Sequence, residues 1–236
     1  MGLEDIVSVL ETYRGREKTM RTLQYGLLFV TPLAKQNVRV ALETISSQIG
    51  TARLILRLFD DLPMLQYSLS CFKENKGKDT LVRWLEVVTT VVDQLYFPVE
   101  HLAWARDMKV FRGSSASLWH ASLLLWGLSL ILTILRSLRV ISLMKQQHRQ
   151  AAAKEDKDKI EVLYRRELLT VIMQAADLLN ALNWMPRRPW TKPFLVWQVR
   201  PECRWRPWHL PFPQWQVGFL GLVSSLIGFS KFLSGQ

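Results

Sequence analysis

Cysteine is the scarcest residue in this chain, with only Cys71 and Cys203 among 236 residues. Two cysteines do not make the disulfide framework that stabilises small secreted domains. The chain also has no CxxC pair, so the usual thiolate zinc site is excluded. The sequence therefore fits a reducing compartment, or one in which the redox state of the protein does not matter.

Motifs that mark enzymes are missing as well. The chain contains no GxSxG nucleophile motif, no Walker loop, no dinucleotide fingerprint and no HExxH metal motif. None of its histidines pairs with another at metal-ligand spacing: His101, His120, His148 and His209. Glu100-His101 could resemble a proton relay, but we interpret it as the polar side of a helix. We expect no catalytic, cofactor-binding or metal site and no enzymatic activity.

Targeting signals at the two ends are also missing. The first residues carry the acids Glu4 and Asp5 where a secretory signal would carry bases, and the apolar run is short and broken. Gly2 is followed at position 6 by Ile6 instead of Ser or Thr, so the myristoylation pattern fails. The final LSGQ is not a peroxisomal SKL-type address. We expect no cleavable signal.

Charge and apolar content narrow the class of partner. The net charge is +11 and the pI is about 10, which suits an anionic surface, either nucleic acid or lipid headgroups. No zinc-finger spacing, aromatic ribonucleoprotein motif or basic zipper occurs, so we expect no nucleic acid partner. Hydrophobic residues make up 49% of the chain and mean hydropathy is +0.05, values that suit a membrane protein with much of its chain outside lipid.

An apolar stretch without formal charge, residues 117–135, predicts a first transmembrane helix. It has about 19 residues, close to the ~20 that a helix needs to cross the hydrocarbon core. Arg136 and Arg139 follow it, where long cationic side chains can reach headgroups. The alternative is a buried helix of a soluble domain, although such a helix rarely stays apolar on every face.

A second transmembrane helix is predicted at residues 215–233. Lys231 lies near its end, where the amine can extend to the interface. Small residues recur four apart in this segment, a spacing that lets helix backbones approach closely in lipid. These candidates for helix association are Gly221, Ser224, Ser225 and Gly228. The alternative is that the spacing only tolerates kinks.

Together with the two spans, the rest of the chain predicts an all-α membrane protein with amphipathic N-terminal helices. Residues 1–113 form the amphipathic helical region, and residues 136–213 form a charged, helical inter-span region. Within the latter, residues 187–213 are rich in Pro, Trp and Arg and predict an irregular loop. Apolar periodicity predicts helices over residues 3–29, 38–62, 80–108 and 160–184.

The second of these helices carries the pattern most informative about function. Its apolar residues recur every three or four positions: Ile45, Ile49, Ala52, Leu56 and Phe59. Arg53 and Arg57 belong to the narrow polar remainder. One interpretation is an amphipathic helix in a membrane interface, with its arginines toward phosphates. The other is a core helix of a small helical bundle, and periodicity does not separate the two.

Several long segments together resemble the peroxin-11 family (peroxisomal membrane protein 11), most closely its gamma (C) type. In chain order they are ETYRGREKTMRTLQY from Glu11, TARLILRLFDDLPM from Thr51, DQLYFPVEHLAWA from Asp93, ADLLNALNWMP from Ala176 and GFLGLVSSLIG from Gly218. The resemblance covers nearly the whole chain. Long motifs in a shared order are far more specific than any single motif.

The resemblance implies a multi-pass protein of the peroxisomal membrane that elongates the membrane and promotes peroxisome fission and proliferation. It implies that an amphipathic helix within residues 42–62 inserts into one leaflet, with Arg53 and Arg57 contacting headgroups. Implied partners are membrane lipids, other copies of the chain, sister peroxin-11 proteins, and a fission adaptor with its dynamin-like GTPase. Alternative functions are a small-metabolite channel of this membrane and an adaptor that recruits fission proteins.

The resemblance also implies that both termini face the cytosol. With two spans, the segment between them would lie on the opposite side. That segment holds many bases, including Arg136, Arg139, Lys145 and Arg149. The positive-inside rule would place it in the cytosol, against this topology. We follow the family topology, because peroxisomal insertion need not obey that rule. Residues 187–213 depart from the gamma type, and no role is assigned to them.

Overall fold

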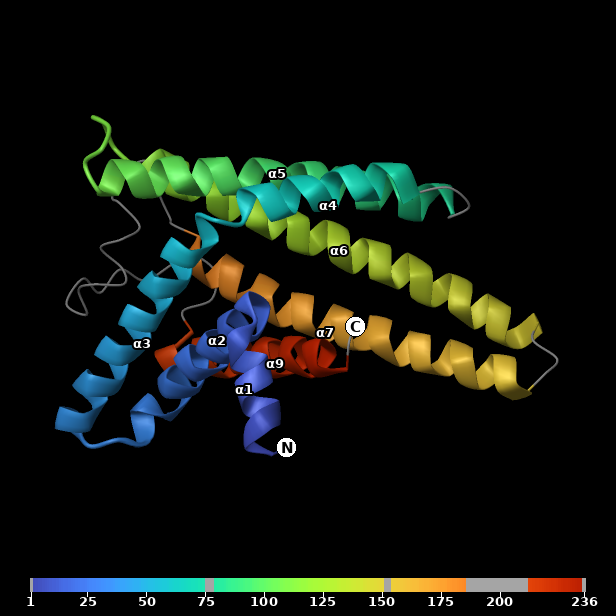
Figure 1. The fold of residues 1–236 in the computed structure, drawn as a ribbon, viewed down its shortest axis with the longest axis horizontal. Helices are drawn as coiled ribbons and strands as arrows, with labels where there is room; N and C mark the ends of the chain where they lie inside the picture. Colours follow the sequence, from blue (N-terminus) through green and yellow to red (C-terminus); the bar gives the residue numbers. More distant parts are fainter. Residues whose placement is uncertain (1, 75–78, 151–153, 186–211, 235–236) are drawn as a thin grey trace.

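The computed structural model describes residues 2–74, 79–150, 154–185 and 212–234. Within these ranges every regular element is a helix and no strand occurs, which confirms the all-α prediction. Figure 1 shows long helices α5, α6 and α7 lying roughly side by side, with α2 and α9 below them and α3 slanting across one end. The irregular loop predicted at residues 187–213 lies outside the described residues, except for its last two positions.

The predicted helix over residues 3–29 is in fact two helices, α1 (Leu3–Glu11) and α2 (Tyr13–Val30). Thr12 between them has extended backbone, and its side chain accepts a hydrogen bond from the Gly15 amide as an N-cap. A Cβ at Gly15 would overlap the Val9 carbonyl, so the close turn requires glycine there. Periodicity missed the break because apolar residues continue on both sides of it.

The next predicted helix, over residues 38–62, is also wrong at its end. After the short 3-10 helix η1 (Thr31–Leu33), α3 covers Gln36–Arg57 and a separate helix α4 covers Asp61–Glu74. The chain turns at residues 58–60 between them. Pro63 therefore lies in the first turn of α4, where its missing N–H removes no helical hydrogen bond.

Helices α5 (Thr80–Asp107) and α6 (Ala116–Gln150) form an antiparallel pair. Asp79 caps α5 by accepting hydrogen bonds from the Leu81 and Val82 amides, as its place before the predicted helix suggests. The predicted span at residues 117–135 is the first part of α6, which continues well beyond Arg136. Helix α7 (Lys154–Trp184) then returns along α6, and α9 (Gln214–Leu233) contains the second predicted span.

Helices α6 and α9 are the two described helices that are long and apolar enough to cross a membrane. Only 33% of the most apolar window of α6, and 28% of that of α9, is buried inside the chain. A core helix of a soluble protein would be mostly buried, so the exposed apolar surface favours lipid as the surroundings of these helices.

A buried ion pair joins three helices. The Arg21 guanidinium of α2 donates to both carboxylate oxygens of Asp177 on α7, each at 2.6 Å, and to the Ser224 hydroxyl of α9 at 2.9 Å. One turn further along α7, the Asn180 side chain donates to the Val217 carbonyl of α9 at 3.3 Å. These polar contacts fix the positions of α2 and α9 on α7.

Glycine lets α9 lie directly against α2. A Cβ at Gly218 would lie 2.5 Å from the Phe29 backbone nitrogen, and a Cβ at Gly221 would overlap the Tyr25 ring. At Gly228, by contrast, an added Cβ would make an ordinary contact 3.6 Å from the Met173 sulfur. Helix α9 therefore approaches α2 closely at Gly218 and Gly221, in its N-terminal half, and not at Gly228.

This packing predicts that Gly218→Ala destabilises the protein while Gly228→Ala does not. Both changes raise helix propensity equally, so the difference isolates the steric cost, which we expect to be ~1–3 kcal/mol for overpacking against backbone. Thermal unfolding of the detergent-solubilised variants measures it. Equal unfolding temperatures for the two variants would contradict the α2–α9 packing.

Candidate membrane-binding site

The predicted membrane-inserting residues all lie on α3 or in the turn that follows it. Ile45 and Phe59 are 49% and 73% exposed and point outward together with Ile55, which is 43% exposed. The remaining apolar members are only partly exposed: Ile49, Ala52 and Leu56. The predicted apolar face is thus divided between an outer surface and the contact with neighbouring helices.

The inner contact of α3 is made by Leu54, which widens the apolar side of the helix in the sequence pattern, and by two small residues that the pattern did not select. Ser46, Gly50 and Leu54 are its buried residues. The Ser46 hydroxyl donates to the Gln24 carbonyl of α2 at 3.0 Å, and Leu54 packs with Ala103 of α5 and Trp119 of α6. Ser46 and Gly50 carry a weak hydrophobic signal, so the sequence pattern could not reveal their part of this contact.

Arg53 is held by α2. Its guanidinium donates to the Glu17 carboxylate at 2.7 Å and to the Gln24 side-chain oxygen at 2.7 Å. The Arg53 side chain is only 13% exposed. Burial alone would raise the pKa of Glu17, but the charges of Arg53 and Lys18 outweigh burial and lower that pKa to about 2.

Arg57 is held by α5. It lies 3.0 Å from the Glu100 carboxylate and donates to the Tyr96 hydroxyl at 3.2 Å. Tyr96 in turn donates to Glu100 at 2.5 Å. In this arrangement both arginines neutralise acids of the same chain. Their implied role as headgroup contacts stays a prediction, and it would require these pairs to open or the arginines to reach phosphates from within them.

The turn between α3 and α4 is fixed by contacts to other helices. The His101 ring of α5 lies 3.0 Å from the Asp61 carboxylate and 3.2 Å from the Arg57 carbonyl. The Tyr13 hydroxyl of α2 donates to the Leu56 carbonyl at 3.0 Å. These contacts satisfy carbonyls at the C-terminal end of α3 and hold Phe59 in its exposed position.

The small residues of α9 lie inside the protein. Gly221, Ser224 and Ser225 are buried, and both serine hydroxyls donate to the Gly221 carbonyl. Gly228 faces Met173 of α7. This face associates with helices of the same chain, and association with another chain through it stays a prediction. Sequence reasoning missed Gly218, whose contact with α2 is among the closest of α9, and it missed the α2 partner Arg21.

Glu100, His101 and Asp107 contact different partners, so they do not form a proton relay. Glu100 contacts Arg57, His101 contacts Asp61, and Asp107 accepts from the Trp119 indole at 2.6 Å. Among the residues that the structure describes, no three His, Cys, Asp or Glu side chains gather in a group that could hold a metal ion.

The Arg53 contacts predict that Glu17→Gln weakens the docking of α3. We expect a loss of ~1–3 kcal/mol, because Arg53 keeps its burial but loses its charged partner. The matched control is Glu43→Gln, whose partner Arg39 is 46% exposed and which we expect to be nearly neutral. Denaturant unfolding of the purified variants provides the comparison.

The same pair predicts a dependence on acid. Folding lowers the pKa of the Glu17 carboxylate, so the ionised carboxylate stabilises the folded state at any pH above its pKa in the unfolded chain. That stabilisation disappears as the pH falls toward about 2, the pKa in the folded state. The difference between wild type and Glu17→Gln should therefore shrink below pH 4.5, the ordinary value. A difference that grows in acid would contradict the Glu17–Arg53 pair.

The matches to known proteins cover nearly the whole chain. Residues 3–233 match the model of the family described as peroxisomal biogenesis factor 11 (PEX11). The chain is 36% identical over 211 residues to peroxisomal membrane protein 11C of Mus musculus and equally to that of Homo sapiens. These matches cover 84% of this chain and 88% of each relative.

A more distant relative is peroxisomal membrane protein PMP27 of Saccharomyces cerevisiae, 30% identical over 104 residues, which are 44% of this chain and 43% of the yeast protein. No solved structure matches the chain. The match to the family model runs from the first residues of α1 to the end of α9, and it confirms the resemblance carried by the sequence motifs. The chain therefore belongs to the peroxisomal biogenesis factor 11 (PEX11) family and is a protein of the peroxisomal membrane.

Proposed function

We propose that this protein shapes and elongates the peroxisomal membrane and promotes peroxisome fission and proliferation. The observation that carries the proposal is the exposed apolar surface of α3 and of the turn after it, where Ile45, Ile55 and Phe59 remain exposed although the helix is docked. An apolar face with no partner in the chain, on a protein of the peroxisomal membrane, suits insertion into a leaflet.

Insertion would act as a wedge. Burying the exposed part of each of the three side chains among acyl chains contributes ~1–2 kcal/mol, a share of the value for full burial. The pairs of Arg53 with Glu17 and of Arg57 with Glu100 keep the inserted helix attached to α2 and α5. Because the helix occupies area in one leaflet only, the bilayer relieves the imbalance by curving, and many copies together would draw it into a tubule.

The proposal requires no covalent step, and we propose that the protein is not an enzyme. Its immediate partners are membrane lipids, and copies of this chain and sister peroxin-11 proteins concentrate the wedges. We further propose that a fission adaptor and its dynamin-like GTPase act on the narrowed membrane. Both termini would face the cytosol, where such soluble partners are found.

The alternative of a metabolite channel gains no support from three buried serines of the two predicted spans. Ser122 donates to the Trp119 carbonyl, and Ser224 and Ser225 donate to the Gly221 carbonyl. These hydroxyls are buried and bonded within their own helices. A polar path needs hydroxyls that face an opening, so membrane shaping is the better-supported function.

The wedge predicts that removing its apolar side chains abolishes elongation. The variant Ile45→Ser, Ile55→Ser, Phe59→Ser should reach peroxisomes but no longer elongate them or increase their number. The control is Val162→Ser with Leu163→Ser, which also removes exposed apolar side chains, here from the charged N-terminal half of α7. Imaging of tagged variants beside a peroxisomal matrix marker measures number and length.

If the triple variant reaches peroxisomes and still elongates them as well as the wild type does, α3 is not the wedge. If the control loses activity to the same degree, general loss of apolar surface would explain the result and the proposal would fail in the same way.

A further inference from the structure

Helix α5 borders the first span at both of its ends, and α7 borders most of its length. At one end the Trp119 indole of α6 donates to Asp107 of α5. At the other end Arg136 of α6 contacts Glu86 of α5 at 3.1 Å and Glu167 of α7 at 2.6 Å. Figure 1 shows α5, α6 and α7 running beside one another roughly along the long axis of the molecule. If lipid surrounds α6 between these two ends, lipid also borders α5 and α7.

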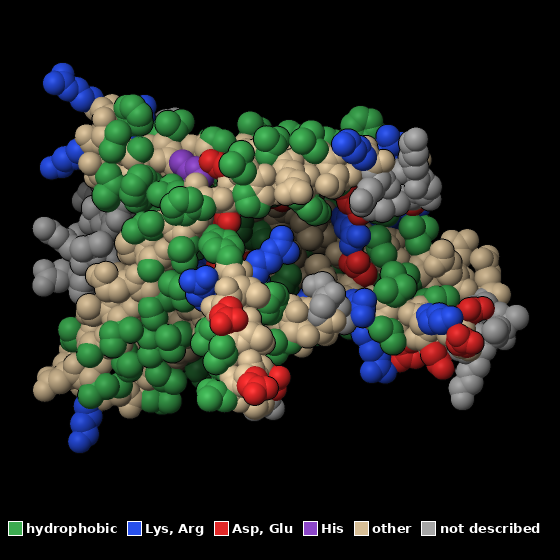
Figure 2. Space-filling view, in the orientation of Figure 1, with side chains coloured by type: hydrophobic (Ala, Val, Ile, Leu, Met, Phe, Trp, Pro, Cys, Tyr) green, Lys and Arg blue, Asp and Glu red, His purple; other side chains and the backbone are tan. Residues whose placement is uncertain are grey.

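The outward side of α5 is entirely apolar between residues 84 and 107. Its exposed side chains there recur every three or four positions: Trp84, Val88, Val91, Leu95, Pro98 and Leu102. The exposed side chains of α6 between residues 116 and 138 are of the same kind, Leu124, Leu128, Ile131, Leu135 and Leu138. In Figure 2 hydrophobic side chains gather along the α4–α5 edge of the molecule.

The second half of α7 has the same character. Between residues 168 and 185 its exposed side chains are Leu168, Leu169, Ile172 and Leu179. Its polar groups point inward instead: Asp177, Asn180 and Asn183 are at most 5% exposed. On α5, likewise, Thr90 and Glu100 are each 3% exposed. A helix at a water-facing surface has the opposite arrangement, with polar residues outside.

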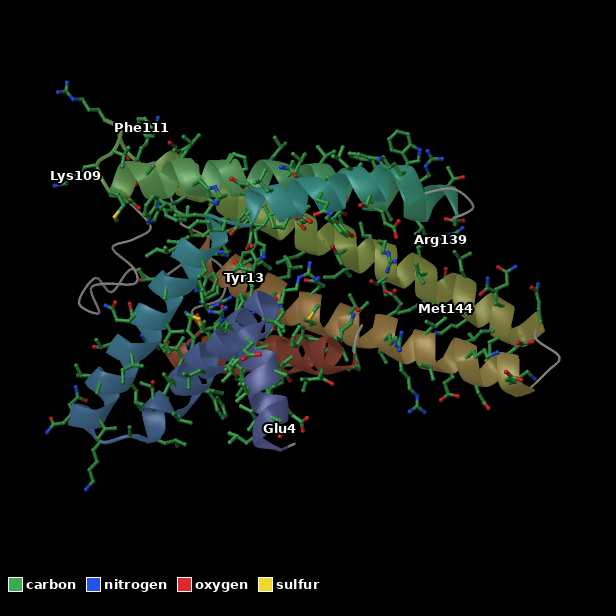
Figure 3. All side chains as sticks on the ribbon, viewed as in Figure 1. Glu4, Tyr13, Lys109, Phe111, Arg139 and Met144 are labelled. Atoms are coloured by element: carbon green, nitrogen blue, oxygen red, sulfur yellow. The ribbon has the colours of Figure 1, made fainter. Side chains whose placement is uncertain are left out.

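Charged groups border this apolar zone on both sides. Trp119 and Arg136 are separated along α6 by about 26 Å at ~1.5 Å per residue, close to the ~30 Å of a hydrocarbon core. Lys109 and Phe111 extend from the α5–α6 turn at one border, and Arg139 lies at the other (Figure 3). Arg139 contacts Asp79 at 2.9 Å, which places the start of α5 at the second border.

We infer that α5 and residues 168–184 of α7 lie within the bilayer beside α6 and α9, with their outward side chains in contact with lipid acyl chains. The membrane part then includes at least these four crossing segments instead of two isolated spans. Arg136 is paired between the helices, with Glu86 of α5 and Glu167 of α7, as the low polarity of hydrocarbon favours. This inference concerns how the chain is embedded and does not depend on the wedge proposed for α3.

Four crossings also remove the conflict with the positive-inside rule. The Lys231 amine near the end of α9 donates to Thr170 of α7 at 2.6 Å, so the C-terminus lies at the same border as Arg136 and Arg139. The chain beyond Arg136, with Lys145 and Arg149, therefore lies on the same side as the C-terminus. With the termini in the cytosol, these bases are cytosolic too.

Sidedness of the α6–α7 connection tests the inference. In full-length protein with Cys71→Ser and Cys203→Ser, single cysteines are placed as Gln146→Cys, Ser234→Cys and Val110→Cys. A membrane-impermeant maleimide is added to cells whose plasma membrane alone is opened. We expect Gln146→Cys and Ser234→Cys to react, and Val110→Cys to react only after the peroxisomal membrane is opened. Protection of Gln146→Cys while Ser234→Cys reacts is the two-span result and overturns the inference.

Lipid contact is measured separately with nitroxide labels on Val91→Cys and Leu95→Cys in the same full-length protein, reconstituted in vesicles. We expect high accessibility to oxygen and low accessibility to a water-soluble nickel chelate, equal to a label on Leu128→Cys in α6. Access of the nickel chelate would mean water at this face. Exclusion of both reagents would mean a covering protein. Either result overturns the inference, and normal peroxisomal targeting of each variant controls for misfolding.

Discussion

The contact on which the structure most depends is the buried pair of Arg21 and Asp177, with Ser224 as its third member. It links α2, α7 and α9, which come from distant parts of the chain. Where the outer surface is apolar, water cannot hydrate a buried charge. Removing one member of the pair therefore leaves the charge of the other without compensation. The same condition explains why Arg136 lies between Glu86 and Glu167 and why Arg57 lies against Glu100.

Sequence patterns predicted the helical class, the two apolar spans and the start of α5, because these depend on local periodicity and on a single capping residue. They failed at Thr12 and at residues 58–60, where helices end although apolar spacing continues. Those breaks depend on partners elsewhere in the chain. Gly15 fits against the Val9 carbonyl, and the turn after α3 is held by His101 and Tyr13, contacts that no local pattern encodes.

The candidate site shows the same division. Periodicity found the apolar side of α3, including the exposed Ile45 and Phe59, yet it grouped them with side chains that face neighbouring helices. It could not reveal that Arg53 pairs with Glu17 on α2, because ion-pair partners distant in sequence carry no spacing signal. The family motifs carried the functional prediction further than periodicity did, and the match to relatives across 84% of the chain supports peroxisome biogenesis as its setting.

We propose that copies of this protein bend the bilayer into which they insert. The most direct measurement is electron cryo-microscopy of purified full-length protein reconstituted into anionic vesicles at rising protein-to-lipid ratio. We expect narrow tubules whose total length grows with protein density and which are absent from protein-free vesicles. Spherical vesicles at every density, with the protein shown to be inserted and folded, would contradict it.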